Sequence, residues 1–294
     1  MALFGKSDDD LRCTLCSRTR KEVRQLVAGN LGAVCSDCLP DAIGALPGGD
    51  AYATVLAVVE AVLAAHDVNT PLADSRPLVE AALALSRDQP DHLRRLAEHA
   101  FRLSHFALGL DALGRISASV RSTRDVLNQA YACQRLGRHG QGLQLLAQLD
   151  LPRLSPEERG LCLHNQACMT LKSEPSLTGE ALARERERIE EARMLFGAMP
   201  PSESRRSYLA STTTGLALCA MREPDFAHAE ALLREVLSEV IEPGAEVWLQ
   251  LGDALAAQDD PAGARDNWRK ALRVAHPQTR EWQEAQTRLN GVYR

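Results

Sequence analysis

The sequence predicts a mainly α-helical protein, in which a small cysteine-containing N-terminal module precedes an α-solenoid of paired helices. Two Cys-x-x-Cys pairs lie in the first 40 residues. The remainder is rich in Ala, Leu, Arg and Glu, and the whole chain has only 4% aromatic residues, a composition typical of helices. Small and bulky residues recur in this part at fixed spacings. We therefore expect the cysteine module over 1–47, a linking helix pair over 48–90, and helical repeats over 91–294.

The first pair is Cys13 and Cys16 and the second is Cys35 and Cys38, with 18 residues between the pairs. Each pair can point two thiolates at one ion, so the spacing predicts a tetrahedral site for one Zn²⁺ per chain. A segment of this length cannot bury enough apolar surface to fold alone, and the metal would be its core.

Other readings of the cysteines are weaker. A disulfide needs an oxidising compartment, but Lys6 and three aspartates follow the first five residues, so we expect no signal peptide there. A thioredoxin-like site would use a single pair within a βαβ pattern. The remaining cysteines lie singly in apolar helical segments, where a free thiol acts as a small core residue, and we expect no second metal site. These are Cys133, Cys162, Cys168 and Cys219.

The residues between the pairs match a known pattern, Glu-Val-Arg-x-Leu-x-Ala-Gly followed by a short apolar strand. They do so at Glu22, Val23, Arg24, Leu26, Ala28 and Gly29. Over about 30 of the 294 residues the chain thus resembles the N-terminal zinc-binding domain of the ClpX unfoldase family. The resemblance implies a treble-clef or zinc-ribbon module that forms homodimers and docks protein partners without catalysing a reaction. The family's ATPase is not indicated, because Gly5-Lys6-Ser7 has no preceding strand or upstream glycine.

A basic run at Arg18, Arg20, Lys21 and Arg24 raises the alternative of nucleic-acid binding. However, Glu22 interrupts the run, no aromatic residue is interleaved for base stacking, and the chain has a formal net charge of −5. A face that contacts water or protein is favoured, and nucleic acid is an unlikely partner.

Near the C-terminus, Trp248-x-x-Leu251-Gly252-x-x-Leu255 is followed by Ala264, Trp268 and Ala271. This is the spacing of a 34-residue tetratricopeptide repeat (TPR), in which small residues let two antiparallel helices approach. Asp260-Pro261 supplies the turn and begins the second helix. Small residues 12 apart recur upstream in three more pairs, Ala217 with Ala229, Ala130 with Gly142, and Ala100 with Ala112.

Another unit has its small residues, Ala167 and Ala192, 25 apart, which indicates an insertion. We expect a loop over 172–182 and then an overlong charged helix, which is either a solvated extension or a surface for a partner. A last helix over 280–292, with Thr279 as its N-cap, would seal the stack. Helices are also expected over 52–66 and 77–87.

TPR stacks resemble one another in holding peptides in a groove lined by the first helix of each pair. In that register Asn128 and Asn165 occupy equivalent groove positions, and their amides could clamp a peptide backbone, with Arg124 and Tyr131 beside them. The alternative is that these asparagines cap or bridge helices. In the last unit the equivalent positions are Glu246, Leu249, Gln250 and Asp253.

No catalytic pattern is found: there is no His-Glu-x-x-His and no Gly-x-Ser-x-Gly. The longest apolar stretch, over 52–65, is interrupted by Glu60, so no membrane span is expected. We predict a cytoplasmic, bacterial, non-enzymatic adaptor or scaffold for protein partners. Two alternatives are a regulator whose zinc module binds nucleic acid and a structural subunit of a larger assembly.

Overall fold

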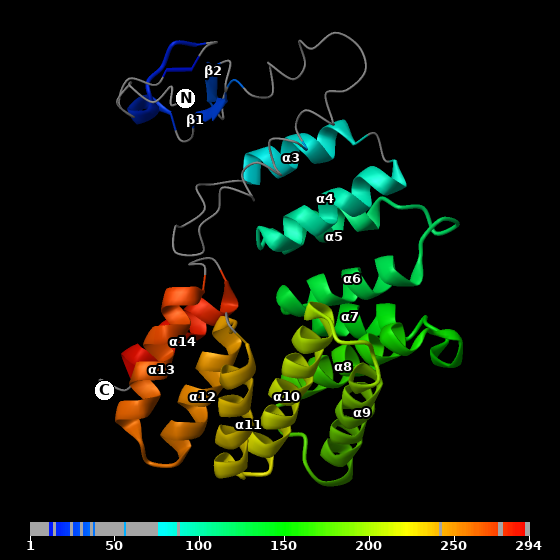
Figure 1. The fold of residues 1–294 in the computed structure, drawn as a ribbon, viewed down its shortest axis with the longest axis vertical. Helices are drawn as coiled ribbons and strands as arrows, with labels where there is room; N and C mark the ends of the chain where they lie inside the picture. Colours follow the sequence, from blue (N-terminus) through cyan, green and yellow to red (C-terminus); the bar gives the residue numbers. More distant parts are fainter. Residues whose placement is uncertain are drawn as a thin grey trace. The chain divides into compact units, whose positions relative to one another are not determined.

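The computed structural model describes residues 12–13, 16–23, 26–29, 32–35, 38, 56, 76–86, 89–240, 243–275 and 279–291. It is mainly α-helical (Figure 1). The chain divides into two compact units, residues 1–121 and residues 122–294, and each is considered by itself.

A β-hairpin is the regular structure of the cysteine module. Strand β1 (Leu26–Gly29) pairs antiparallel with β2 (Gly32–Cys35), in a register that sets Leu26 opposite Cys35 and Gly29 opposite Gly32. A 3₁₀ turn, η2 (Arg20–Glu22), precedes it, with a capping box between Thr19 and Glu22. The predicted apolar strand before Cys35 is confirmed, and it forms a hairpin with residues of the ClpX-like pattern.

Three helices complete the described part of the first unit: α3 (Arg76–Leu85), α4 (Pro90–Arg102) and α5 (Phe106–Gly114). Helix α3 packs against both α4 and α5, around a core that includes Val79, Leu93 and Leu113. The helix predicted over 77–87 is α3. Of the helix predicted over 52–66, the structure describes only Leu56, which is helical and buried, and the other residues lie outside the described part of the chain.

The second unit is a run of helix pairs that ends in a single helix. The helices are α6 (Thr123–Arg135), α7 (His139–Leu146), α8 (Pro156–Ser173), α9 (Gly179–Gly197), α10 (Glu203–Arg222), α11 (Phe226–Glu239), α12 (Ala245–Ala257), α13 (Pro261–Val274) and α14 (Arg280–Gly291). A 3₁₀ turn, η3 (Leu151–Arg153), precedes α8. Short connections make the helices of a pair antiparallel, and each helix contacts the next (Figure 1).

The predicted small residues lie where paired helices meet. Ala130, Ala217, Ala229 and Ala264 are fully buried. A Cβ atom built on Gly252 would lie 2.5 Å from the Trp268 ring, and one on Gly142 of α7 would lie 3.3 Å from the Cβ atom of Cys133 in α6. The 12-residue spacing therefore identified the helix pairs, because α12 and α13 approach so closely that Trp268 occupies the space of a side chain at 252.

The predicted loop over 172–182 is shorter than expected, and the overlong charged helix predicted after it is confirmed. Lys172 and Ser173 still belong to α8, which has 18 residues, and α9 begins at Gly179 and has 19. The additional residues lengthen both helices, and only 174–178 connect them. Gly179 begins the new helix with a φ of +58°, a conformation that favours glycine.

The charged residues of α9 tie it to its neighbours. Arg186 pairs with Glu223 at 3.0 Å, Arg193 pairs with Glu235 at 3.2 Å, and Glu191 pairs with Arg159 of α8. These contacts favour the interpretation of α9 as a long helix with a solvated, ion-paired face over that of a dedicated partner surface.

The turn and cap predictions are confirmed. Asp260 accepts a hydrogen bond from the Gly263 amide at 2.9 Å, and Pro261 is the first residue of α13. Thr279 accepts one from the Trp282 amide at 3.4 Å at the start of α14. Ala285 of α14 is fully buried against the α12–α13 core, so α14 covers one end of this stack.

Candidate metal centre and groove

Two tight backbone turns present the four cysteines. In the first, the Ser17 amide donates to the Cys13 carbonyl at 2.8 Å and the Cys13 amide donates to the Arg18 carbonyl at 2.8 Å. Ser17 has a φ of +60°, which lets the chain reverse directly after Cys16. In the second, the Cys38 amide donates to the Cys35 carbonyl at 3.1 Å. Since Cys35 ends β2, the hairpin sets the second turn against the first.

The four sulfur atoms fit a tetrahedral zinc centre. All lie within 4.8 Å of one another, and the sulfurs of Cys16 and Cys35 are 3.7 Å apart. Zinc–thiolate bonds of about 2.3 Å in a regular tetrahedron would separate sulfur atoms by about 3.8 Å. Cys13 and Cys35 are buried and Cys16 and Cys38 are half-buried, as expected for a closed structural site.

A backbone amide and a guanidinium donate hydrogen bonds to these sulfurs. The Cys35 amide donates to the Cys13 sulfur at 3.3 Å, and the Arg18 guanidinium donates to the sulfurs of Cys16 at 3.3 Å and Cys35 at 3.9 Å. Arg18 lowers the pKa of the Cys16 thiol, whereas hydrogen bonding to Cys16 raises the pKa of Cys38 to about 12. A bound cation would favour the thiolate form at all four positions.

The four helix cysteines are of a different kind. All are buried, as predicted, and burial raises the pKa of Cys162 to about 11 and the pKa values of Cys168 and Cys219 to about 12. The Cys168 sulfur lies 3.7 Å from the His164 ring, but burial lowers the pKa of His164 to about 4, so both groups are neutral near pH 7. This pair is not an activated nucleophile.

A hollow of about 370 Å³ lies in the second unit, which we call the charged groove. The first helices of four successive pairs line it, namely α6, α8, α10 and α12, together with α14. Leu218, Met221 and Leu249 supply apolar surface. Gln250 is only 8% exposed, and its Oε1 atom has no hydrogen-bond partner among the described residues.

Ion pairs between different helices surround the charged groove. Lys172 pairs with Glu246 at 2.6 Å, Arg135 with Glu281 at 3.2 Å, and Arg288 with Asp253 at 2.6 Å. Burial opposes the charge on Glu246, yet Lys172 keeps the pKa of this carboxyl below its ordinary value of 4.5. Similarly, burial opposes the charge on Lys172, but Glu246 raises the pKa of this amine above 10.5.

Arg222 has a different role in the charged groove. Its guanidinium donates to the carbonyl oxygens of Pro175 at 2.7 Å and Leu171 at 3.4 Å. It therefore places a cation at the C-terminal end of α8, where the helix dipole favours positive charge.

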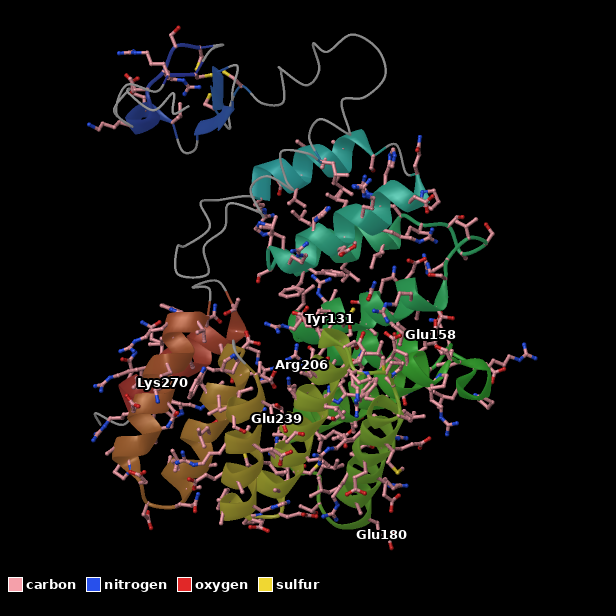
Figure 2. All side chains as sticks on the ribbon, in the orientation of Figure 1. Tyr131, Glu158, Glu180, Arg206, Glu239 and Lys270 are labelled. Atoms are coloured by element: carbon pink, nitrogen blue, oxygen red, sulfur yellow. The ribbon has the colours of Figure 1, made fainter. Side chains whose placement is uncertain are left out.

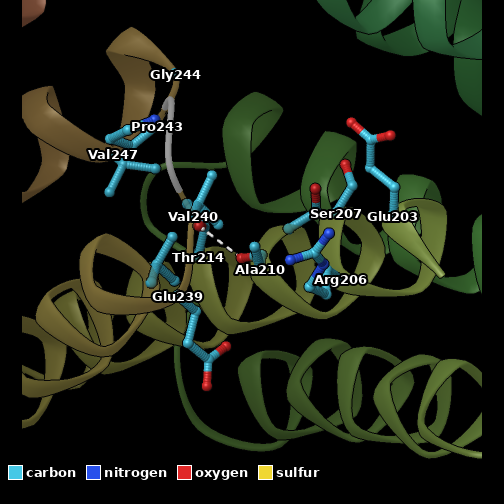
Figure 3. A pocket seen from close by; sticks show the side chains of 12 residues that line it. Glu203, Arg206, Ser207, Ala210, Thr214, Glu239, Val240, Pro243, Gly244 and Val247 are labelled. Carbon is cyan, nitrogen blue, oxygen red and sulfur yellow. Dashed lines mark hydrogen bonds between the residues drawn. The ribbon is translucent and has the colours of Figure 1, made fainter. Parts of the chain in front are cut away.

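A second hollow of about 520 Å³ lies between α10, α11 and α12 (Figure 3). Val236, Val247 and Ala210 give it a buried apolar floor, and Glu203, Arg206 and Glu239 are exposed at its rim. The Thr214 hydroxyl donates to the Ala210 carbonyl within its own helix at 2.9 Å. No sequence pattern indicates this hollow, because it depends on the separation of α10 and α12.

The four predicted groove residues do not line either hollow. Asn165 is buried on α8 and Asn128 is half-buried on α6, while Tyr131 is exposed on α6 (Figure 2). Arg124 donates to Glu157 at 3.2 Å and to the Tyr208 hydroxyl at 3.4 Å, which links the first turns of α6 and α8 to α10. These contacts use Arg124 within the stack.

The register was right for the last unit, where all four aligned positions line the charged groove. These are Glu246, Leu249, Gln250 and Asp253. On α6 and α8 the lining lies at least one turn later, at Gln134 and Arg135 and at Lys172. The repeat pattern in the sequence does not predict this shift, because the shift depends on the lengths of α8 and α9. No local sequence signal marks Arg135 or Lys172 as a groove residue, because each has the pattern of a solvated cation on a helix.

No protein-family model and no curated protein matches the sequence. Among solved structures, the chain resembles a protein in the APC/C hetero-tetramer Cut9–Hcn1, with TM-score 0.55, 13% identity, and coverage of 85% of this chain and 44% of that one. It also resembles a tetratricopeptide repeat protein from Parabacteroides merdae, with TM-score 0.48, 16% identity, and coverage of 84% and 100%. Another neighbour is PilF of Pseudomonas aeruginosa, with TM-score 0.43, 17% identity, and coverage of 86% and 99%.

At such identities the likeness concerns the fold alone. The helix pairs and their small-residue contacts define the class, a protein of TPR-like helical repeats with an N-terminal four-cysteine cluster, and the likeness at TM-score 0.55 agrees with this fold. None of its described helices is both long enough and apolar enough to cross a bilayer.

Proposed function

We propose that this protein is a cytoplasmic, non-enzymatic adaptor, in which the helical repeats hold a segment of a partner protein and a ClpX-like zinc module provides a second contact. The charged groove is the observation that carries the proposal. It combines apolar surface at Leu218 and Leu249 with the buried Oε1 atom of Gln250, which has no hydrogen-bond partner in the described part of the chain. An extended peptide offers side chains to this apolar surface and a backbone amide to the Gln250 oxygen.

The occupant of the charged groove can be tested by photo-crosslinking in lysate of the native host. A benzophenone amino acid replaces Leu218 in the groove, and in a matched control it replaces Met194, which is 69% exposed on α9. The proposal expects a discrete crosslinked protein from position 218 alone. Equal labelling from both positions would place the contact elsewhere.

The predicted asparagine clamp can be tested with the same probe. If Asn128 and Asn165 hold the client backbone, Asn128→Ala with Asn165→Ala abolishes crosslinking from position 218 while the helical circular dichroism stays unchanged. Retained crosslinking would assign recognition to the groove residues alone. Because Asn165 is only 6% exposed, a loss of helicity would instead identify it as a structural residue.

For the zinc module we propose homodimerisation and docking, with one Zn²⁺ held by Cys13, Cys16, Cys35 and Cys38. Sedimentation velocity of the zinc-loaded chain should give a dimer, and Cys35→Ser should give a monomer with the helices intact. Fluorescence anisotropy with single-stranded and duplex DNA tests the alternative. Binding that weakens steeply with salt and depends on Lys21 would support a nucleic-acid role.

A further inference from the structure

Arg18 contacts the cysteine cluster in a way that its place in the basic run does not predict. Its Nε donates to the sulfur of Cys16, and its Nη2 reaches the sulfur of Cys35. One of these sulfurs comes from each Cys-x-x-Cys pair. A single planar guanidinium therefore spans both halves of the centre.

The backbone of Arg18 fixes this position. Its carbonyl oxygen accepts the Cys13 amide at 2.8 Å, which closes the first turn, and Ser17 reverses the chain just before it. The side chain is half-buried. Both the backbone carbonyl and the guanidinium of Arg18 are thus held within the cysteine module. An arginine on a solvated face would instead have its guanidinium in water.

The charge of a zinc centre with four thiolates explains what such a residue does. Four thiolates and one Zn²⁺ leave a net charge of −2, and hydrogen bonds to the sulfurs withdraw electron density from them. Donors of this kind hold ligands in place and make bound thiolates less reactive. Lysine could supply the charge, but its compact ammonium lacks the fork needed to reach two sulfurs at once.

We infer that Arg18 is a positioning residue of the zinc centre, which joins the two cysteine pairs and slows metal release and thiolate oxidation. The inference rests on the zinc centre proposed above. A guanidinium that contacts sulfur is not available to phosphates. Arg18 and Lys21 therefore have different roles, although both belong to the basic run.

The test uses the full chain and its Arg18→Ala, Arg18→Lys and Arg18→Gln variants. Arg12→Ala is the matched control, because Arg12 lies in the same module and its guanidinium donates to the Ser17 carbonyl at 3.3 Å, not to a sulfur. Two quantities are measured: the rate of zinc transfer to a chromophoric chelator, with and without hydrogen peroxide, and the thiolate-to-cobalt absorption of the Co²⁺-loaded protein.

Arg18→Ala should lose zinc about tenfold faster or more, the range seen when outer hydrogen-bond partners of metal ligands are removed. Its thiolate-to-cobalt band should shift, because the sulfurs become better electron donors. Arg18→Lys should recover part of the retention, Arg18→Gln less, and Arg12→Ala should match the unsubstituted chain. If Arg18→Ala does not fold, the Arg18→Lys variant decides, with release still faster than in the unsubstituted chain.

Two results would overturn the inference, and they differ. Release rates and cobalt spectra that are the same in the Arg18 variants and in Arg12→Ala would leave the zinc centre standing but give Arg18 no part in it. Failure of the unsubstituted chain to bind Zn²⁺ or Co²⁺ would remove the centre itself, and the role of Arg18 with it.

Discussion

At the scale of single residues, the Lys172–Glu246 pair makes a pH-dependent contribution to stability. Lys172→Met leaves a carboxylate without its nearest partner in a site that disfavours charge, and we expect a loss of about 1–3 kcal/mol near neutral pH. The folded-state pKa of Glu246 lies below its ordinary value of 4.5, so the pair's stabilisation is complete above that pH and fades as the pH falls through the folded-state pKa. Urea unfolding from pH 3 to pH 7 should show the two proteins converging in acid. Arg153→Met, which breaks the exposed pair with Asp150, should cost less than about 0.5 kcal/mol at any pH.

At the scale of helices, the contact between α12 and α13 depends on the missing side chain at Gly252. Gly252→Ala places a methyl group against the Trp268 ring and 3.0 Å from the Ala264 carbonyl, and the backbone of α13 must move to admit it. We expect a loss of about 1–3 kcal/mol. Gly140→Ala in α7 meets nothing within 4 Å and should be neutral or stabilise by up to about 1 kcal/mol. Urea midpoints followed by circular dichroism at 222 nm compare them, and equal midpoints would show that α13 shifts without cost.

At the scale of the whole molecule, removal of the metal should affect one part of the chain. The apolar clusters of the second unit are built within residues 122–294 and use no residue of the cysteine module. If the proposed Zn²⁺ is the core of the module, chelation of the full chain should unfold the module and leave the thermal midpoint of the helices unchanged. Metal analysis should show one equivalent of zinc lost, and Cys35→Ser should behave as the chelated chain does. A helical midpoint several degrees lower after chelation would contradict this independence.

How far the sequence predicts the protein depends on the range of the interactions involved. The helix pairs follow from small residues 12 apart, and the caps at Asp260 and Thr279 follow from residues three positions apart. The cysteine cluster follows from spacing, because two short turns and a hairpin suffice to bring the sulfurs together. The helix pairs, the caps and the cysteine cluster each depend on short-range backbone geometry, which the spacing of residues in the sequence predicts.

The charged groove depends on contacts between helices that are distant in the sequence. The sequence therefore predicts its lining residues only in the last unit. Lys172 lines the groove because α8 extends to Ser173, and its partner Glu246 lies two helix pairs further along the chain. Nothing in the local pattern distinguishes Lys172 from a solvated lysine. The role of Arg18 was missed for a related reason: in a basic run, a guanidinium that faces sulfur cannot be told from one that faces water.

Contacts of α14 with the first helix pair distinguish the second unit from an open repeat array. Arg135 of α6 pairs with Glu281, and His139 at the start of α7 lies 3.5 Å from Arg280. In an open array each repeat needs only its neighbours, so a partly synthesised chain already has working repeats. Here one wall of the groove comes from a helix that is made well over a hundred residues after the wall opposite. The growing chain can therefore stack its first helix pairs on the ribosome before the charged groove is complete, and the partner proposed for this groove could bind only after α14 has docked.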